Sequence, residues 1–151
     1  MIWEKFEETK NEYPEEIVKE AIKGFSDATD KRVEMVVNKL SFTKAQFNFK
    51  SLVGEFYFEL NLSSPYVNIC EISIMKFCYD ASMSSVVCII HQEILDEIKS
   101  KLFSDGIEEY NKNFICSPKI FNNLLEIIFE SKKFNSIVSG LIKISNKKSF
   151  K

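Results

Sequence analysis

The clearest pattern of hydrophobic and polar positions lies just before the middle of the chain. In AQFNF the apolar residues Ala45, Phe47 and Phe49 alternate with polar ones, and GEFYFELNL continues the alternation after a turn at residues 51–54. Such alternation is typical of strands with one buried and one solvated face. The two segments therefore predict an antiparallel hairpin, whose wet face carries Glu55, Tyr57, Glu59 and Asn61.

Further strands are predicted on both sides of this hairpin. Residues 31–40 contain the β-branched run VEMVV, which favours a strand. After the break at Ser63-Ser64-Pro65, YVNICEISIMKFCY places Val67 and Ile69 in one phase and the next apolar residues in the other. A change of phase within one apolar run predicts a long strand with a bulge.

Helices are predicted at both ends of the chain. Residues 2–11 suggest a short helix, and a second begins at Tyr13-Pro14, where proline suits the first helical position and the acids that follow suit the positive end of the helix dipole. That helix is expected to end near residues 24–26. Its apolar face repeats at helical spacing through Ile17, Val18, Ala21, Ile22 and Phe25.

Three more helices are predicted in the second half. Residues 84–103 repeat apolar side chains at helical spacing and precede Gly106, which closes the helix. Ser117-Pro118 supplies a capping hydroxyl and a first-turn proline for the next helix. Residues 133–144 form the last. The apolar stripe of the Ser117-capped helix consists of Ile120, Phe121, Leu124, Leu125, Ile128 and Phe129.

This order of elements predicts an α+β fold. An antiparallel sheet of about four strands, arranged as a meander, carries the N-terminal and C-terminal helices on one face. The length of 151 residues fits one domain, covering residues 1–151, and a chain of this size buries roughly 70% of the surface that its unfolded form exposes. Neither a metal nor a disulfide is needed to stabilise such a core.

Composition and charge narrow the class of protein. Fourteen of the twenty aromatic residues are Phe, Arg32 is the only arginine, and the formal net charge is −2. A weakly acidic chain with one arginine argues against direct binding of nucleic acid. The N-terminus lacks the pattern of a secretory signal, and the longest apolar runs are too short to cross a bilayer. A cytoplasmic protein without a membrane anchor is therefore expected.

The most suggestive chemistry lies in SVVCIIHQE, which holds His91, the only histidine, with Cys88 three residues before it and Glu93 two residues after. If both lay on one helix, Cys88 and His91 would share a face. A zinc site needs three or four protein ligands, and the chain offers no second histidine and no CxxC pair. The zinc deaminase motif also lacks its P-C-x-x-C half. His91 is therefore expected to be a boundary residue of the helix.

Other catalytic patterns are not found in the sequence. The four glycines are scattered, so no phosphate-binding loop forms, and neither a GxSxG nor an HExxH motif occurs. Cys70, Cys78, Cys88 and Cys116 are too far apart in sequence for a metal-binding pair, and we expect them to be reduced and buried. The sequence therefore predicts a protein without catalytic residues, metal or cofactor.

The charge distribution is uneven along the chain. Residues 1–30 carry nine acids and four lysines, residues 90–110 carry six acids and two lysines, and residues 132–151 carry six lysines and no acid. Acidic faces orient docking onto basic partners, and tyrosine is a frequent anchor of protein interfaces. We therefore expect the partner-binding residues to be Glu55, Tyr57, Glu59, Glu93, Asp96, Glu97, Asp105, Glu108 and Glu109.

In general character this small, acidic chain, rich in Lys, Phe, Ile and Asn, resembles the bacterial immunity proteins that neutralise toxins of contact-dependent growth inhibition. The segment EKFEETKNEYPEEIVKEAIKGF is also similar to the N-terminal helix, proline and acidic turn of the SUKH immunity superfamily. The glycine and tryptophan pattern expected downstream in that superfamily is missing, so its fold is not transferred. The resemblance implies a stoichiometric inhibitor that occludes the active site of a toxin domain in the cytoplasm.

The leading hypothesis is therefore a non-catalytic inhibitor that binds a basic, nuclease-like toxin domain. Two alternatives stay open. A small enzyme could assemble its site from scattered acids, His91 and a cysteine, which predicts a deep polar pocket around His91. A structural or adaptor protein could instead use the basic C-terminal tail to contact nucleic acid or an acidic partner.

Overall fold

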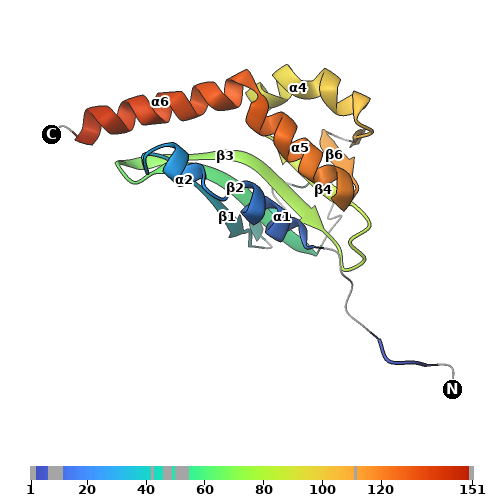
Figure 1. Cartoon of the computed structure of the whole chain (residues 1–151). Helices are drawn as coiled ribbons and strands as arrows, with labels where there is room; N and C mark the ends of the chain where they lie inside the picture. Colours follow the sequence, from blue (N-terminus) through green and yellow to red (C-terminus); the bar gives the residue numbers. More distant parts are fainter. Residues whose placement is uncertain are drawn as a thin grey trace.

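The computed structural model describes residues 3–6, 12–41, 43–45, 49, 55–110 and 112–149. An antiparallel sheet of six strands, in the order β1-β2-β3-β4-β6-β5, forms its centre (Figure 1). The α+β prediction is confirmed, with two strands more than the four predicted. The strands are β1 Glu34–Lys39, β2 Phe56–Ser64, β3 Val67–Tyr79, β4 Val86–Ile90, β5 Glu108–Tyr110 and β6 Asn113–Cys116.

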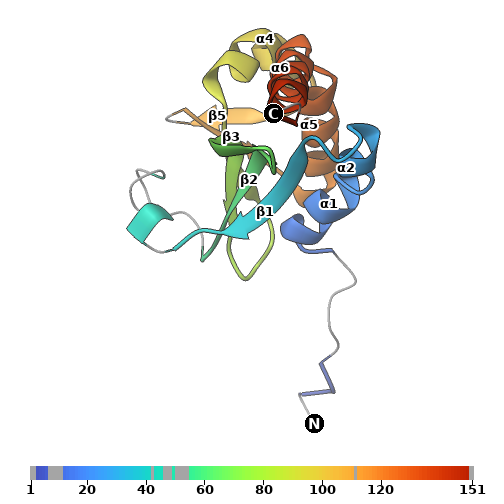
Figure 2. The ribbon, with the colours of Figure 1, turned by 90° about the vertical axis from the view of Figure 1, so that its left-hand side faces the viewer.

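The helices cover one face of this sheet and bury a common core (Figure 2). Side chains of β2 and β3, such as Leu60 and Phe77, meet helical side chains such as Ile98 and Phe121, and all four are fully buried. This apolar area, removed from water, supplies the main free energy of folding. The helices are α1 Pro14–Ala21, α2 Phe25–Ala28, α4 Gln92–Ser104, α5 Pro118–Glu130 and α6 Lys132–Ser149.

The long strand with a bulge is confirmed in β3. Leu60 of β2 lies opposite Met75, whereas the next residue, Asn61, lies opposite Ser73, so Ile74 is the extra residue of β3. Ile74 and Met75 are both buried in the main core. The bulge therefore explains why apolar residues of this strand change phase along the sequence.

The helix predicted over residues 84–103 is in fact a strand followed by a helix. Val86–Ile90 forms β4, which pairs with β3 on one side and β6 on the other, and α4 starts only at Gln92. A strand in the middle of a sheet with both faces covered is apolar throughout. In the run VVCII, helical and strand periodicity cannot be distinguished.

The prediction that residues 45–49 form the first strand of a hairpin is also wrong for the residues of this segment that the structure describes. Ala45 lies in a helical turn, and the N–H of Phe49 donates to the carbonyl of Ala45; residues 46–48 and 51–54 lie outside the described residues. The partners of β2 are β1 and β3 instead. Ala45 and Phe49 cover the second face of the sheet and form a small core with Leu40, Tyr57, Cys78 and Val87.

The remaining predictions concern the ends of elements. The strand within residues 31–40 and the start of a helix at Pro14 are confirmed. The predicted end of that helix near residues 24–26 is wrong, because α1 ends at Ala21 and Phe25 begins the separate helix α2 after Gly24, which has a positive φ of 84°. Gly106 follows the end of α4 with a positive φ of 77°. The hairpin of β5 and β6 was not predicted. Of the helix predicted over residues 2–11, residues 3–6 are not helical, and the other residues lie outside the described part of the chain. No helix in the described ranges is long and apolar enough to span a membrane.

Candidate binding surface

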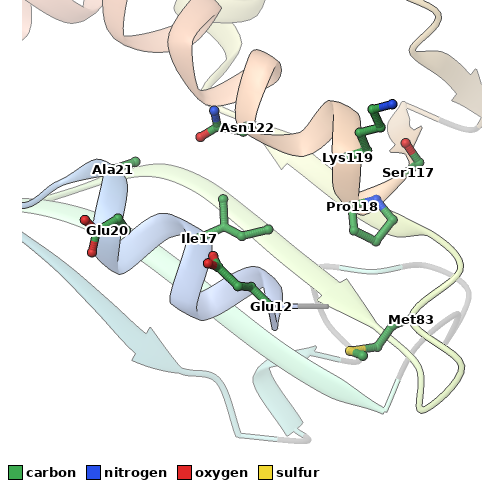
Figure 3. A pocket seen from close by; sticks show the side chains of 9 residues that line it. All are labelled: Glu12, Ile17, Glu20, Ala21, Met83, Ser117, Pro118, Lys119 and Asn122. Carbon is green, nitrogen blue, oxygen red and sulfur yellow. The ribbon is translucent and has the colours of Figure 1, made fainter. Parts of the chain in front are cut away.

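An open groove lies between α1 and α5. Its volume is about 660 Å³. Ile17 of α1 lies on the side of Pro118 of α5, Ala21 lies on the side of Asn122, and Met83 lies at one end (Figure 3). Glu12 and Glu20 line the α1 side, and Lys119 lines the α5 side. The groove thus combines an apolar floor with charged rims, as binding sites for protein segments often do.

The α1 wall is held by one buried residue and one hydrogen bond to the sheet. Val18 is completely buried in the main core. The hydroxyl of Tyr79, at the end of β3, donates to the two carboxylate oxygens of Glu15, with oxygen–oxygen distances of 2.6 and 2.8 Å. Burial and the Glu15 carboxylate raise the pKa of Tyr79 above its ordinary value. A protonated Tyr79 therefore ties α1 to β3 throughout the neutral pH range.

The end of the groove is formed by the loop between β3 and β4. The backbone N–H and the hydroxyl of Ser82 both donate to the Asp80 carboxylate, and the N–H of Met83 donates to the Asp80 carbonyl. The Ser82 hydrogen bonds hold the pKa of Asp80 below its ordinary value. Met83 adopts a positive φ of 52° in this turn, and its side chain lies at the mouth of the groove (Figure 3).

The α5 wall begins with the helix cap that the sequence predicts. The hydroxyl of Ser117 accepts a hydrogen bond from the N–H of Ile120 at 3.2 Å, and Pro118 occupies the first helical position. The predicted apolar stripe then turns into the core, with Phe121, Leu124, Leu125 and Ile128 buried. The cap and the stripe together fix which face of α5 lines the groove.

The outer side of α1 is strongly acidic. Residues 12–30 carry six acids against two lysines, a net charge of −4. Glu12, Glu16 and Glu20 are exposed. Within the described part of the chain, Glu12 and Glu16 form no ion pair, and Glu20 meets only Lys23, at 3.8 Å, with both side chains about three-quarters exposed. An exposed pair of this kind contributes little, so the carboxylates of Glu12, Glu16 and Glu20 are available to a partner.

Aromatic side chains extend this surface toward the sheet. The ring of Tyr79 stacks on Phe56 and on Tyr13, with ring centroids 5.2 and 6.3 Å apart. Tyr79 is buried, whereas Tyr13 is half exposed and Phe56 also reaches the surface. Exposed aromatics beside carboxylates are frequent anchors of protein interfaces. We use the name α1 surface for Glu12, Glu16 and Glu20, the groove, and the exposed aromatic residues Tyr13 and Phe56.

The six acids predicted to bind a partner between positions 93 and 109 lie on α4, on β5 and between these two elements. Two of them, Glu93 and Glu97, form contacts with α6. The backbone N–H groups of Lys132 and Lys133 both donate to the Glu97 carboxylate at 2.8 Å. Glu93 forms an ion pair with the side chain of Lys133. These contacts hold the pKa of Glu97 and that of Glu93 below their ordinary values. Glu97 is therefore a cap at the N-terminus of α6.

The other acids of this region are mixed in their contacts. Glu109 pairs with Lys99 at 3.5 Å, which joins β5 to α4. Asp96 accepts a hydrogen bond from the side chain of Gln92. Asp105 and Glu108 are exposed and form no ion pair with a described residue. The acids of this region therefore differ in their contacts: Glu93, Glu97 and Glu109 contact other elements of the fold, whereas Asp105 and Glu108 form no ion pair with a described residue.

The remaining predicted binding residues are Glu55, which directly precedes β2, and Tyr57 and Glu59 of β2. The N–H of Glu55 donates to the carbonyl of Tyr79, next to the α1 surface. Tyr57 is only 5% exposed and packs on Phe49, so its prediction as a surface anchor is wrong: the chain after β1 covers this side of the sheet. Glu55 is exposed. Glu59 accepts from Asn61 and pairs with Lys76 at 3.3 Å.

Hydrogen bonds explain the charge state of Glu59. Burial opposes ionisation of this carboxyl, yet hydrogen bonds from Asn61 and Ser73 and the charge of Lys76 outweigh burial and hold its pKa below the ordinary value. The amide of Asn61 also donates to Glu71 at 2.9 Å. Glu59 is thus part of a polar network that ties β2 to β3.

His91 and Cys88 do not share a helix. Cys88 lies in β4 and is completely buried, whereas His91 is the N-cap residue of α4. Burial raises the pKa of the Cys88 thiol well above its ordinary value, so the thiol stays protonated. Nδ1 of His91 is buried and has no hydrogen-bond partner among the described residues, and His91 lines neither the α1–α5 groove nor the smaller groove beside β1.

The cysteines and possible metal ligands can be stated only for the described residues. Among these, Cys78, Cys88 and Cys116 are buried and free, and burial raises the pKa of Cys78 to about 12. No group of three or more His, Cys, Asp or Glu side chains in these ranges is arranged to hold a metal ion.

Sequence reasoning missed the groove but contained two signals for it. Pro14-Glu15-Glu16 marked the start of an acidic helix, and the net charge of residues 1–30 marked its surface.

Comparisons with protein-family models, with curated proteins and with solved structures gave no match.

Proposed function

We propose that the chain is a non-catalytic inhibitor of the immunity type, which binds a basic, nuclease-like toxin domain and covers its active site. The observation that carries this proposal is the row of exposed carboxylates at Glu12, Glu16 and Glu20, beside a groove with an apolar floor. Among the described residues, Glu12 and Glu16 form no ion pair and Glu20 forms only an exposed one with Lys23, and such carboxylates gain most from a cationic partner.

Inhibition follows from the chemistry of such a partner. A domain that cleaves nucleic acid must hold a polyanion with cationic side chains around its active site. A surface that combines carboxylates with exposed aromatic rings binds the same cationic side chains and excludes the substrate. The α1 surface thus inhibits by occupying the site for the phosphate backbone, with no chemistry of its own.

The first test is recovery of the partner. The tagged chain serves as bait in an extract of the cells that make it, first at low and then at moderate salt. We expect a basic protein to be retained, and its nuclease activity, measured with a fluorogenic nucleic acid, to be lost at equimolar bait. A retained protein that keeps full activity in the complex would contradict the inhibitor function.

The second test locates the surface. In one variant Glu12, Glu16 and Glu20 are each changed to Lys; in the matched control, Asp96, Asp105 and Glu108 are each changed to Lys. Both variants change the net charge by the same amount. We expect the α1 variant to bind the recovered domain about 100-fold more weakly, an effect of about 2.7 kcal/mol. The control should bind within about threefold of the wild type.

A further inference from the structure

The N-terminal arm, residues 3–6, is the most unusual surface feature outside the groove. Trp3 is 70% exposed and Phe6 is 79% exposed. The arm lies away from the sheet and the helices, in both views (Figures 1 and 2). Side chains as large as Trp and Phe are normally buried in the protein or at an interface. Two of them side by side on an exposed arm suggest a contact with another molecule.

The two rings are already close to each other. Their centroids are 6.0 Å apart and the rings are tilted by 45°. In the sequence, Ile2, Trp3 and Phe6 follow the spacing of one face of a helix, although residues 3–6 are not helical here. Segments of this kind form an amphipathic helix when they enter an apolar groove on a partner.

The charge around the arm specifies the partner. Residues 1–16 carry six acids against two lysines; Glu4 and Lys5 lie between the two aromatic residues, and the acidic excess follows Phe6. The arm is continuous in sequence with the acidic start of α1. A partner pocket that accepts Trp3 and Phe6 next to these carboxylates must therefore have an apolar floor and a basic rim.

We infer that the N-terminal arm is a second anchor for the partner of the α1 surface: Trp3 and Phe6 insert into an apolar, basic-rimmed pocket on that protein. This inference rests on the proposed function, because it assigns both contacts to the same basic domain. The two contacts are joined covalently, so the second forms at a high effective concentration once the first has formed.

Site-specific photo-cross-linking tests the inference in the full-length chain. Benzoylphenylalanine replaces Trp3 in one variant, Ala21 of the groove in a second, and Phe103 in a third. Phe103 is a matched control, because it is a half-exposed aromatic residue on α4. After irradiation in the cells that make the protein, mass spectrometry identifies the linked peptides. We expect positions 3 and 21 to link to the same basic protein, and we expect no link from position 103 to that protein.

The outcomes separate the two proposals. If position 21 links to a basic protein and position 3 links only to its own chain, to a second copy or to lipid, the arm is not an anchor and the proposed function stands. If position 21 links to no basic protein, the proposed function fails, and the arm inference fails with it.

Trp3 also gives an independent readout, because it is the only tryptophan in the chain. Its fluorescence should shift to shorter wavelength and become protected from iodide when the recovered domain is added. Trp3→Ala combined with Phe6→Ala should weaken binding by about 30-fold or more, as the loss of an interface anchor does. Unchanged emission and unchanged affinity would overturn the inference.

Discussion

Helices α1 and α4 both direct carboxylates to the surface, but these carboxylates meet different neighbours. On α4, Glu93 contacts the side chain of Lys133, and Glu97 contacts the backbone at the start of α6. At the α1 surface, Glu12, which precedes α1, and Glu16 of α1 form no ion pair with a described residue. Acids that are equally frequent in the sequence therefore differ in role: Glu93 and Glu97 stabilise the fold, whereas Glu12 and Glu16 stay available for binding.

The difference arises from tertiary structure. The lysines of residues 132–133 lie 35 or more positions beyond Glu97 in the sequence, and the packing of α4 against α6 brings them together. No charge count over a local window contains this contact. To locate a partner-binding surface, one must therefore exclude the charged residues that already form contacts within the folded chain.

Among single substitutions, the largest effect should come from Ala21→Arg on the α1 side. Ala21 is exposed at the end of α1 and lines the groove, so a long cationic side chain there fills the groove and repels a basic partner. We expect binding of the recovered domain to weaken about 30-fold, or about 2 kcal/mol, measured by titration calorimetry. Ser100→Arg, on the exposed side of α4, is the matched control and should bind as the wild type does. Equal losses in both variants would mean that the groove has no special role.

Tyr79→Phe removes the hydroxyl that holds Glu15. A hydrogen bond to a charged group is worth about 1.5 kcal/mol or somewhat more, so the free energy of unfolding should fall by about that amount in urea titrations. The raised pKa of Tyr79 has a further consequence: its stabilisation is complete below the ordinary tyrosine pKa of about 10 and is lost as the pH rises above it. Tyr79→Phe should therefore be less sensitive to alkaline pH. A variant as stable as the wild type would show that this hydrogen bond does not hold α1.

Glu97→Gln tests the stabilising role of the α4 acids. The pKa of Glu97 is lowered by the N–H groups of Lys132 and Lys133. A lowered pKa stabilises the fold above the ordinary value of 4.5 and loses this effect as the pH falls through the folded-state pKa. At pH 7 the variant should melt a few degrees below the wild type, as expected when a helix loses a capping charge, and the difference should shrink toward pH 3. Asp96→Asn, without such a contact, should melt with the wild type; equal losses would mean that the cap is unimportant.

The smallest effect is expected from Lys99→Ala. Its ion pair with Glu109 lies at the surface, with the lysine side chain about half exposed. Such a pair contributes at most about 0.5 kcal/mol, and added salt should reduce even that difference in thermal unfolding. A loss well above 1 kcal/mol would show that the β5–α4 contact contributes far more to stability than an exposed pair should.

The fold could be predicted where the local pattern is unambiguous. Pro14, the Ser117-Pro118 cap and the phase change in β3 each have a single physical meaning, and all three are confirmed. The VVCII run fails this condition, because a strand buried on both faces lacks alternation. The prediction that Tyr57 lies on the solvated face was wrong for a different reason. A separate segment, with Ala45 and Phe49, covers the face of the sheet that the alternation alone predicts to be solvated.

The candidate site was less accessible to sequence reasoning than the fold. The acidic character of residues 1–30 was visible, but the groove needs α5, which begins about a hundred residues later. Conversely, Glu93 and Glu97 looked equally available until α6 was placed beside them. Both errors concern contacts between segments far apart in the chain, which depend on packing rather than on local pattern.

Hydrogen exchange of the complex tests the central claim most directly. Backbone amide exchange is measured for the chain alone and with the recovered domain, and the changes are compared between residues 12–22 and residues 92–110. The claim that α1 carries the binding surface predicts slowed exchange in residues 12–22 and in the loop around Met83, with residues 92–110 unchanged. Slowed exchange over residues 92–110, with α1 unaffected, would contradict it.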